Sequence, residues 1–210
     1  MQGISKRLSS VAALVHQDAA IADIGTDHGY IPVYLVKKGI VKSAIASDIN
    51  IGPLNSCKLL VEDEGLSDKI DVRLSDGLEK IEAHECDTVI IAGMGGELIA
   101  DILDKCKYIN EKHLILQPMT HPEIVRKYLY DNGFVIDNDI IVNDGNHNYS
   151  VFDARYTGEV LPKRRIDYFL GNIQDFSNKE YFTHLLNYFY NKSKSGEDYS
   201  DIIKSLEDII

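Results

Sequence analysis

The 210-residue sequence predicts an α/β fold built on a mainly parallel sheet. Up to Gly133, short apolar runs alternate with segments of helical periodicity, a pattern typical of a parallel sheet covered on both faces. The expected helices have proline near their start and glycine just past their end, which is the usual asymmetry of helix termini. The length is sufficient for one domain with a core and a small appendage.

The first helix is expected over residues 4–15, where apolar residues recur at helical spacing. Five apolar runs then predict strands at residues 20–24, 43–48, 70–74, 87–92 and 113–117. Three helices are expected between and after them, running from Pro32 to Gly39, from Pro53 to Gly65 and from Pro122 to Gly133.

Two strand-like runs follow, at residues 134–142 and 148–156. Asp144-Gly145 between them is a strong signal for a β-hairpin turn. A parallel sheet that ends in an antiparallel hairpin is the architecture of class I (Rossmann-like) methyltransferases, whereas a dehydrogenase sheet more often continues with another helical crossover. The predicted fold is therefore a class I methyltransferase fold with a seven-stranded sheet.

The composition changes after Pro162, where two apolar stripes at helical spacing flank Ser195-Gly196. The stripes are Tyr181, Phe182, Leu185, Leu186 and Phe189, then Ile202, Ile203, Leu206, Ile209 and Ile210. They predict an antiparallel helical hairpin, too small to bury its apolar surface alone. We expect a catalytic domain at residues 1–161 and a helical appendage at residues 162–210.

The net charge of −11 argues against a general polyanion-binding protein. Residues 1–161 carry −10, whereas residues 162–195 carry +3. No apolar run approaches the roughly 20 residues that span a bilayer, and the start lacks the apolar segment of a signal peptide, so we expect a cytoplasmic protein without membrane contact. Three scattered cysteines and scattered histidines predict no metal site.

The loop ADIGTDHGYIP, residues 22–32, indicates the ligand. Dinucleotide-binding loops use glycines so that backbone amides approach a pyrophosphate, but here Asp27 stands between Gly25 and Gly29. A carboxylate about 4 Å from a phosphate costs on the order of 1–4 kcal/mol. S-adenosyl-L-methionine has no phosphate and carries a sulfonium and an ammonium group, so an acidic loop with glycines favours that cofactor.

Further acids and glycines follow successive strands. Asp48 is placed to accept the ribose hydroxyls, a role that NAD sites share, and Asp76 is placed to meet the adenine amino group. Alone, an acid after a strand is often only a helix cap, and a glycine pair only a turn. Because all of them fall at one sheet edge, we predict as cofactor-binding residues Asp23, Gly25, Gly29, Asp48, Asn50, Asp76, Gly77, Gly93, Met94 and Gly95.

With these motifs, the sequence closely resembles the bacterial TrmK family, whose members methylate N1 of adenine at tRNA position 22. The resemblance rests on ISKRL (4–8), ADIGTDHGYIP (22–32), DGLE (76–79), IAGMGG (91–96) and LILQP (114–118), and it continues into the helical tail. It implies a Rossmann-like catalytic domain with a C-terminal coiled-coil pair, S-adenosyl-L-methionine as cofactor and tRNA as partner. We expect a monomer.

N1 of adenine has an in-plane lone pair and can attack a methyl group without first losing a proton, so the protein has to align the base and stabilise a cationic product. AGMGG stands where enzymes that methylate N6 usually carry N/D-P-P-Y/F/W. The base must be unpaired or flipped out.

The catalytic candidates are Asp27, His28 and Tyr30, with Tyr30 stacking on the base and Asp27 or a carbonyl near Gly93 accepting from its amino group. The alternatives are a loop hydrogen bond for His28 and helix packing for Tyr30.

The predicted substrate contacts are Lys6, Arg7, Gln117, Pro118, Arg164 and Arg165. Charged residues on a helix are, alternatively, a solvated face. Three other functions stay open: methylation of another RNA or a small molecule, NAD(P)-dependent oxidoreduction, and non-catalytic RNA binding by a retained cofactor fold.

Overall fold

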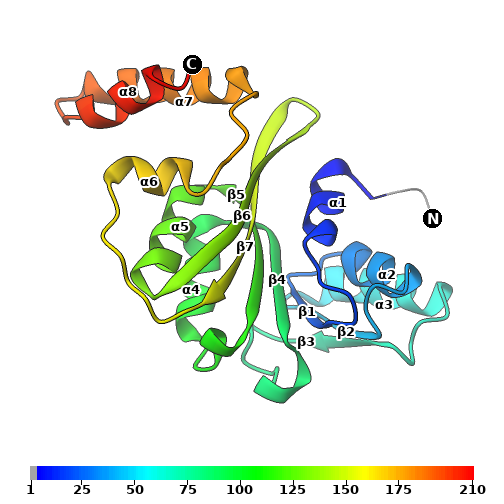
Figure 1. Cartoon of the computed structure of the whole chain (residues 1–210). Helices are drawn as coiled ribbons and strands as arrows, with labels where there is room; N and C mark the ends of the chain where they lie inside the picture. Colours follow the sequence, from blue (N-terminus) through cyan, green and yellow to red (C-terminus); the bar gives the residue numbers. More distant parts are fainter. Residues whose placement is uncertain (1–3) are drawn as a thin grey trace.

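A computed structural model describes residues 4–210, so residues 1–3 of the expected catalytic domain lie outside the description. Its centre is a seven-stranded sheet in the order β3-β2-β1-β4-β5-β7-β6, in which β7 alone among the described strands runs antiparallel to its neighbours β5 and β6 (Figure 1). The strands are β1 (Ala20–Ile24), β2 (Ser43–Asp48), β3 (Ile70–Leu74), β4 (Thr88–Gly95), β5 (His113–Thr120), β6 (Phe134–Asp144) and β7 (His147–Tyr156). The order confirms the predicted class I methyltransferase fold.

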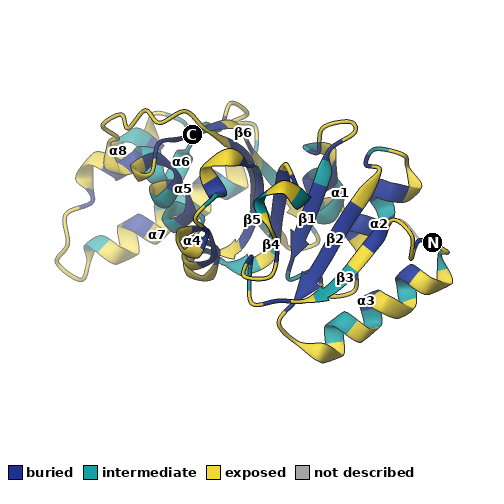
Figure 2. Cartoon of the chain, turned by 90° about the horizontal axis from the view of Figure 1, so that it is seen from below, coloured by how far each residue is buried: buried dark blue, intermediate teal, exposed yellow. Residues whose placement is uncertain are grey.

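Helices cover both faces of the sheet. One core cluster lies under α1 (Lys6–Ala13), α2 (Tyr30–Lys37) and α3 (Ile51–Asp63), and the other under α4 (Gly96–Lys105) and α5 (Pro122–Asp131). Short 3₁₀ turns occur at Ala83–Glu85 and Ile109–Glu111. Figure 2 shows the central strands in dark blue and much of the outer surface of the helices in yellow, as expected for a sheet buried on both faces.

The predicted boundaries of β1, β2 and β3 are confirmed, while β4 and β5 each continue three residues further and β4 begins one residue later. The extension arises because the two strands stay paired through register shifts around Met94. Helices α2 and α3 begin two residues before Pro32 and Pro53, which still lie in the first turn, where a missing N–H costs no hydrogen bond. The first helix is shorter than residues 4–15.

The predicted hairpin is present, but its turn is one residue later than expected. Asp144 still pairs with His147, so Gly145 and Asn146 form the turn, and Gly145 has a φ of 67°. On β7, Phe152, Asp153 and Ala154 pair with β5, and the far part of the hairpin extends beyond the sheet between α1 and the C-terminal helices (Figure 1).

The tail contains the predicted helical hairpin, formed by α7 (Lys179–Ser193) and α8 (Ser200–Glu207). It also contains a short helix that the sequence did not predict, α6 (Arg165–Leu170). Ile209 and Ile210 lie beyond the end of α8, so the predicted second stripe was too long. Phe182, Phe189, Ile202 and Leu206 form the centre of a third apolar cluster, which packs against Ile166 of α6.

A buried ion pair fastens α6 to the main domain. Arg126 of α5 binds both carboxylate oxygens of Asp139 on β6, at 2.8 and 2.9 Å, and both side chains are fully buried. The same guanidinium donates to the carbonyl of Phe169 at 2.9 Å, and the backbone N–H of Asn172 donates to Asp139 at 3.2 Å. Helix α6 is therefore continuous in packing with the sheet, although it follows Pro162.

Candidate cofactor and substrate site

A cavity of about 660 Å³ lies at the carboxyl ends of β1, β4 and β5, where α1 closes one side. Six of the predicted site residues line it: Arg7, Asp23, Gly25, Asp27, Tyr30 and Gly93. The other lining residues are Ile4, Ser5, Leu8, Thr26, Ile31, Ala92 and Met119. Residues far apart in the sequence thus meet at one edge of the sheet, as the alternating pattern predicted.

The loop after β1 needs its glycines for close packing as well as for its conformation. Gly25, Asp27 and Gly29 have φ values of 68°, 53° and 74°, in the left-handed region that favours glycine and tolerates aspartate and asparagine. A Cβ at Gly25 would lie 2.1 Å from Cε of Met94, and one at Gly29 would lie 2.5 Å from Sγ of Cys57. Any side chain at Gly25 or Gly29 would therefore displace the neighbours of this loop.

Asp23 is buried beneath the loop and accepts a 2.6 Å hydrogen bond from Oγ1 of Thr26. Burial raises the pKa of Asp23 from its ordinary 3.8 to about 7, and the nearby charge of Asp48 acts in the same direction, while the hydrogen bond from Thr26 opposes them. No cationic side chain within residues 4–210 pairs with the buried carboxyl of Asp23, an arrangement that suits a site that receives a cation.

The raised pKa of Asp23 predicts how stability depends on pH. Between pH 4 and pH 7 the folded, cofactor-free protein holds this proton more tightly than the unfolded chain, so its free energy of unfolding falls as pH rises through that window. Asp23→Asn should remove this loss, which is on the order of 1.4 kcal/mol per unit of pKa displacement. Urea unfolding of wild type and variant at pH 5 and pH 8 measures this loss of stability, with the exposed Asp68→Asn as control. If wild type and Asp23→Asn lose the same stability between pH 5 and pH 8, Asp23 is not the source of the loss.

The remaining predicted cofactor residues extend the site along the sheet edge. Asp48 is buried at the end of β2, and its Oδ1 accepts from the backbone N–H of Asn50, the N-cap of α3, at 2.7 Å. Asp76 and Gly77 line a separate cavity of about 240 Å³. Gly95 is the N-cap of α4. Between Asp48 and Asn50, Ile49 is exposed and offers an apolar surface that no sequence motif indicated.

The three predicted catalytic residues are close together and open to solvent. Nε2 of His28 lies 3.7 Å from Oδ1 of Asp27, and the His28 and Tyr30 rings are 5.4 Å apart. The Asp27 side chain is 66% exposed. Of the three, Asp27 and Tyr30 line the cavity and His28 does not.

Gln117 lies beneath the cavity, fully buried in β5. Its Oε1 accepts from Nη1 of Arg7 at 2.5 Å and from the backbone N–H of Gly93 at 3.1 Å. Its Nε2 donates to the carbonyl of the buried Pro118 at 2.8 Å. Arg7 also lies over the Tyr149 ring, 5.7 Å from its centroid. The predicted contacts Arg7 and Gln117 are therefore bound to each other.

The basic residues among the other predicted substrate contacts differ in their surroundings. Arg164 pairs with Asp167 at 2.8 Å, and Arg165 contacts Asp201 at 3.4 Å and lies over the Tyr199 ring. Both belong to the α6 region and neither lines the cavity, while Lys6 is exposed on α1 beside it.

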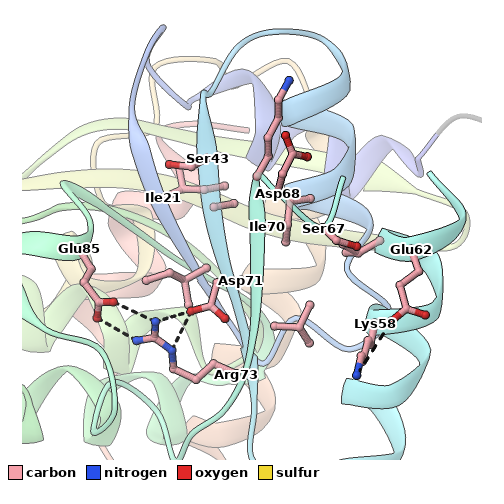
Figure 3. A pocket seen from close by; sticks show the side chains of 15 residues that line it. Ile21, Ser43, Lys58, Glu62, Ser67, Asp68, Ile70, Asp71, Arg73 and Glu85 are labelled. Carbon is pink, nitrogen blue, oxygen red and sulfur yellow. Dashed lines mark hydrogen bonds and ion pairs between the residues drawn. The ribbon is translucent and has the colours of Figure 1, made fainter. Parts of the chain in front are cut away.

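A second hollow of about 600 Å³ lies over the outer edge of β3, near the amino ends of β2 and β3. Figure 3 shows its one guanidinium, that of Arg73, held between Asp71 and Glu85. This hollow contains none of the predicted site residues.

Within residues 4–210, no group of three or more His, Cys, Asp and Glu side chains could hold a metal ion. Nor is any helix in that part of the chain long and apolar enough to cross a membrane.

Comparisons with known proteins agree with this geometry. Residues 4–152 match a methyltransferase-domain family. The tRNA (adenine(22)-N(1))-methyltransferase of Bacillus subtilis is 42% identical over 74% of this chain and 69% of its own length. The crystal structure of B. subtilis TrmK is 32% identical, with a TM-score of 0.83 over 100% of this chain and 95% of that one. M. capricolum TrmK in complex with S-adenosyl-homocysteine is 30% identical, with a TM-score of 0.81 over 98% and 93%. The chain belongs to the TrmK family of tRNA (adenine(22)-N(1))-methyltransferases.

Proposed function

We infer that this protein is an S-adenosyl-L-methionine-dependent methyltransferase that modifies N1 of adenine 22 in tRNA. The observation that carries this function is the 42% identity to the B. subtilis enzyme over 74% of this chain, and the methyltransferase-domain match over residues 4–152 includes every residue that lines the cavity. The acid-rich loop disfavours an oxidoreductase function, because its carboxylates would repel a dinucleotide pyrophosphate. A non-catalytic role does not account for the open cavity beside the cofactor motifs.

The direct test is methylation of a tRNA transcript by the purified protein and cofactor, followed by mass spectrometry of nuclease fragments. A mass increase of one methyl group is expected on the fragment that contains adenine 22. A transcript with guanine at position 22 should stay unmodified. Methylation of both transcripts at equal levels would contradict the assignment to this position.

The residues at the sheet edge fit the cofactor. Gly25 and Gly93, which both have positive φ, line the cavity, and the buried Asp23 and Asp48 supply acceptors for a cationic ligand with ribose hydroxyls. We propose that Asp48 holds the ribose, that Asp76 and Ile49 meet the adenine, and that the methionine end lies over Gly25 and Gly93. When bound, S-adenosyl-L-methionine supplies an electrophilic methyl group, and the chain's residues bind it and exclude competing orientations.

Asp48→Ala should weaken cofactor binding by about 1.5–3 kcal/mol, or 10- to 150-fold, because charged hydrogen bonds to the ribose are lost. Asp76→Ala should have a smaller effect, since it removes a contact to a neutral amino group and Asp76 is exposed. Calorimetric titration measures both affinities, with the exposed Asp63→Ala as control. An unchanged affinity in Asp48→Ala would contradict the ribose assignment.

For the RNA we propose a surface that includes Lys6 on α1 and the basic segment around Arg164 and Arg165. Arg164 and Arg165 already face carboxylates, so phosphates would have to compete with those ion pairs, and binding should be weak and strongly salt-dependent.

A boundary between the catalytic domain and the tail at residue 162 follows the composition, but the packing of α6 on Arg126 supports placing this boundary between α6 and α7. We also propose a monomer that works in the cytoplasm, where its tRNA substrate is found; light scattering of the purified protein tests the monomer.

A further inference from the structure

Two large apolar side chains that line the cavity remain exposed in the free protein. Among the residues that the structure describes, Tyr30 is 43% exposed and Met119 is 42% exposed, and both border the 660 Å³ cavity. A large apolar side chain gains stability when another molecule covers it and removes it from water. Both side chains are therefore accessible to a ligand that binds in this cavity.

The strand order places these two side chains on opposite flanks of one point. Tyr30 begins α2, directly after the β1 loop, and Met119 lies near the end of β5. Strand β4 pairs with β1 on one side and with β5 on the other, and Gly93 lies near the end of β4. Gly93 thus lies between an aromatic ring from the β1 side and a thioether from the β5 side.

The buried amide of Gln117 connects one flank to this point. Its Oε1 accepts from the N–H of Gly93, and its Nε2 lies 3.7 Å from Sδ of Met119. The same Oε1 accepts from Arg7, which closes the cavity from α1. Since Gln117 is 0% exposed and hydrogen-bonded through both ends of its amide, it fixes its neighbours and leaves the ligand contacts to them.

We propose that Met119 forms the second wall of the target-base slot, so that the flipped adenine lies between the Tyr30 ring and the Met119 thioether, and that Gln117 is the residue that positions this wall. The inference rests on the proposed function. An adenine removed from its stack loses contacts on both faces, and an aromatic ring restores one. A polarizable thioether suits the other face, because it packs on aromatic systems without requiring a fixed hydrogen-bond pattern.

Three variants in the full chain test the wall. Met119→Ala should lower kcat/KM for tRNA about 10-fold, whereas Met119→Leu, which keeps the apolar volume, should stay within about 3-fold of wild type. The control is Leu59→Ala on α3, which is 61% exposed but outside the cavity and should behave as wild type. Cofactor affinity, measured by calorimetry, should be unchanged in all three.

A second measurement reports the base position without methylation. A tRNA with 2-aminopurine at position 22 should change its fluorescence when wild type binds, and this change should be lost in Met119→Ala and retained in Met119→Leu. Gln117→Leu should lower kcat/KM at least as much as Met119→Ala, because it also removes the acceptor of Arg7 and Gly93. The loss in the double variant should be smaller than the product of the two single losses, because part of the effect of Gln117 acts through Met119.

Two outcomes distinguish a failure of this inference from a failure of the proposed function. If wild type methylates adenine 22 and Met119→Ala matches it in both measurements, this inference is overturned and the function stands. A wild type that leaves adenine 22 unmodified and gives no 2-aminopurine signal overturns the proposed function and the inference with it.

Discussion

Arg126→Ala should lower the free energy of unfolding by about 3–5 kcal/mol, because it leaves the fully buried carboxylate of Asp139 without a cation. The loss has a second part. Arg126 donates to the carbonyl of Phe169 and contacts Ser150 at 3.2 Å, and these acceptors would lose their donor inside the protein. Urea unfolding followed by circular dichroism measures the effect, and a shift in the transition midpoint with an unchanged slope indicates a stability change in a two-state unit.

A matched control lies on the same helix. Lys127 forms an exposed pair with Asp131, so Lys127→Ala should cost roughly 0.5 kcal/mol or less. Replacing both buried partners, as Arg126→Met with Asp139→Leu, should recover part of the stability because no unpaired charge remains. The recovery should be incomplete, since the α6 carbonyls stay unsatisfied. If Arg126→Ala costs no more than Lys127→Ala, the ion pair does not hold α6 to the sheet.

Asp27→Asn should lower the single-turnover rate of tRNA methylation about 100-fold at saturating cofactor, with a much smaller effect on cofactor affinity. The charge of Asp27 is most useful where positive charge moves from the sulfonium to the adenine ring. One well-placed group of this kind contributes about 10²–10³ in rate. We expect the lower end, because the side chain is 66% exposed in the free protein and solvent screens its charge until the substrate covers it.

Asparagine at position 27 preserves the backbone conformation of the loop. Asp27 has a φ of 53°, and asparagine is the other side chain that adopts this region readily, so a rate loss cannot come from a strained loop. His28→Gln separates two roles, since Nε2 of His28 lies 3.7 Å from Asp27. An equal loss in both variants would mean that Asp27 acts by holding His28. Equal rates for wild type and Asp27→Asn would leave alignment alone as the source of catalysis.

The sequence by itself determined the fold class and the edge of the sheet that carries the site. Apolar runs specified β1 and β2 to the residue, because a strand buried on both faces is mainly apolar and ends where loop residues begin. The edge strand β3 is only partly buried but also has its predicted bounds. Acids and glycines after successive strands predicted one shared edge, since parallel strands bring their carboxyl ends together. The motif resemblance added the reaction and its position on tRNA.

Only the tertiary structure decided which residues are buried supports and which face the cavity. Helix α6 escaped prediction because its six residues are held by contacts from distant parts of the chain, and local periodicity carries no such information. Arg126 donates to the carbonyl of Phe169, and Ile166 packs in the apolar cluster of the C-terminal helices. Gln117 looked like a surface contact at a strand end, yet it is buried, because Arg7 and Gly93 come from other elements to fill its acceptor. Met119 carried no motif at all. Its exposure beside Tyr30 follows from the order in which β1, β4 and β5 lie in the sheet, and that order is a property of packing between distant segments.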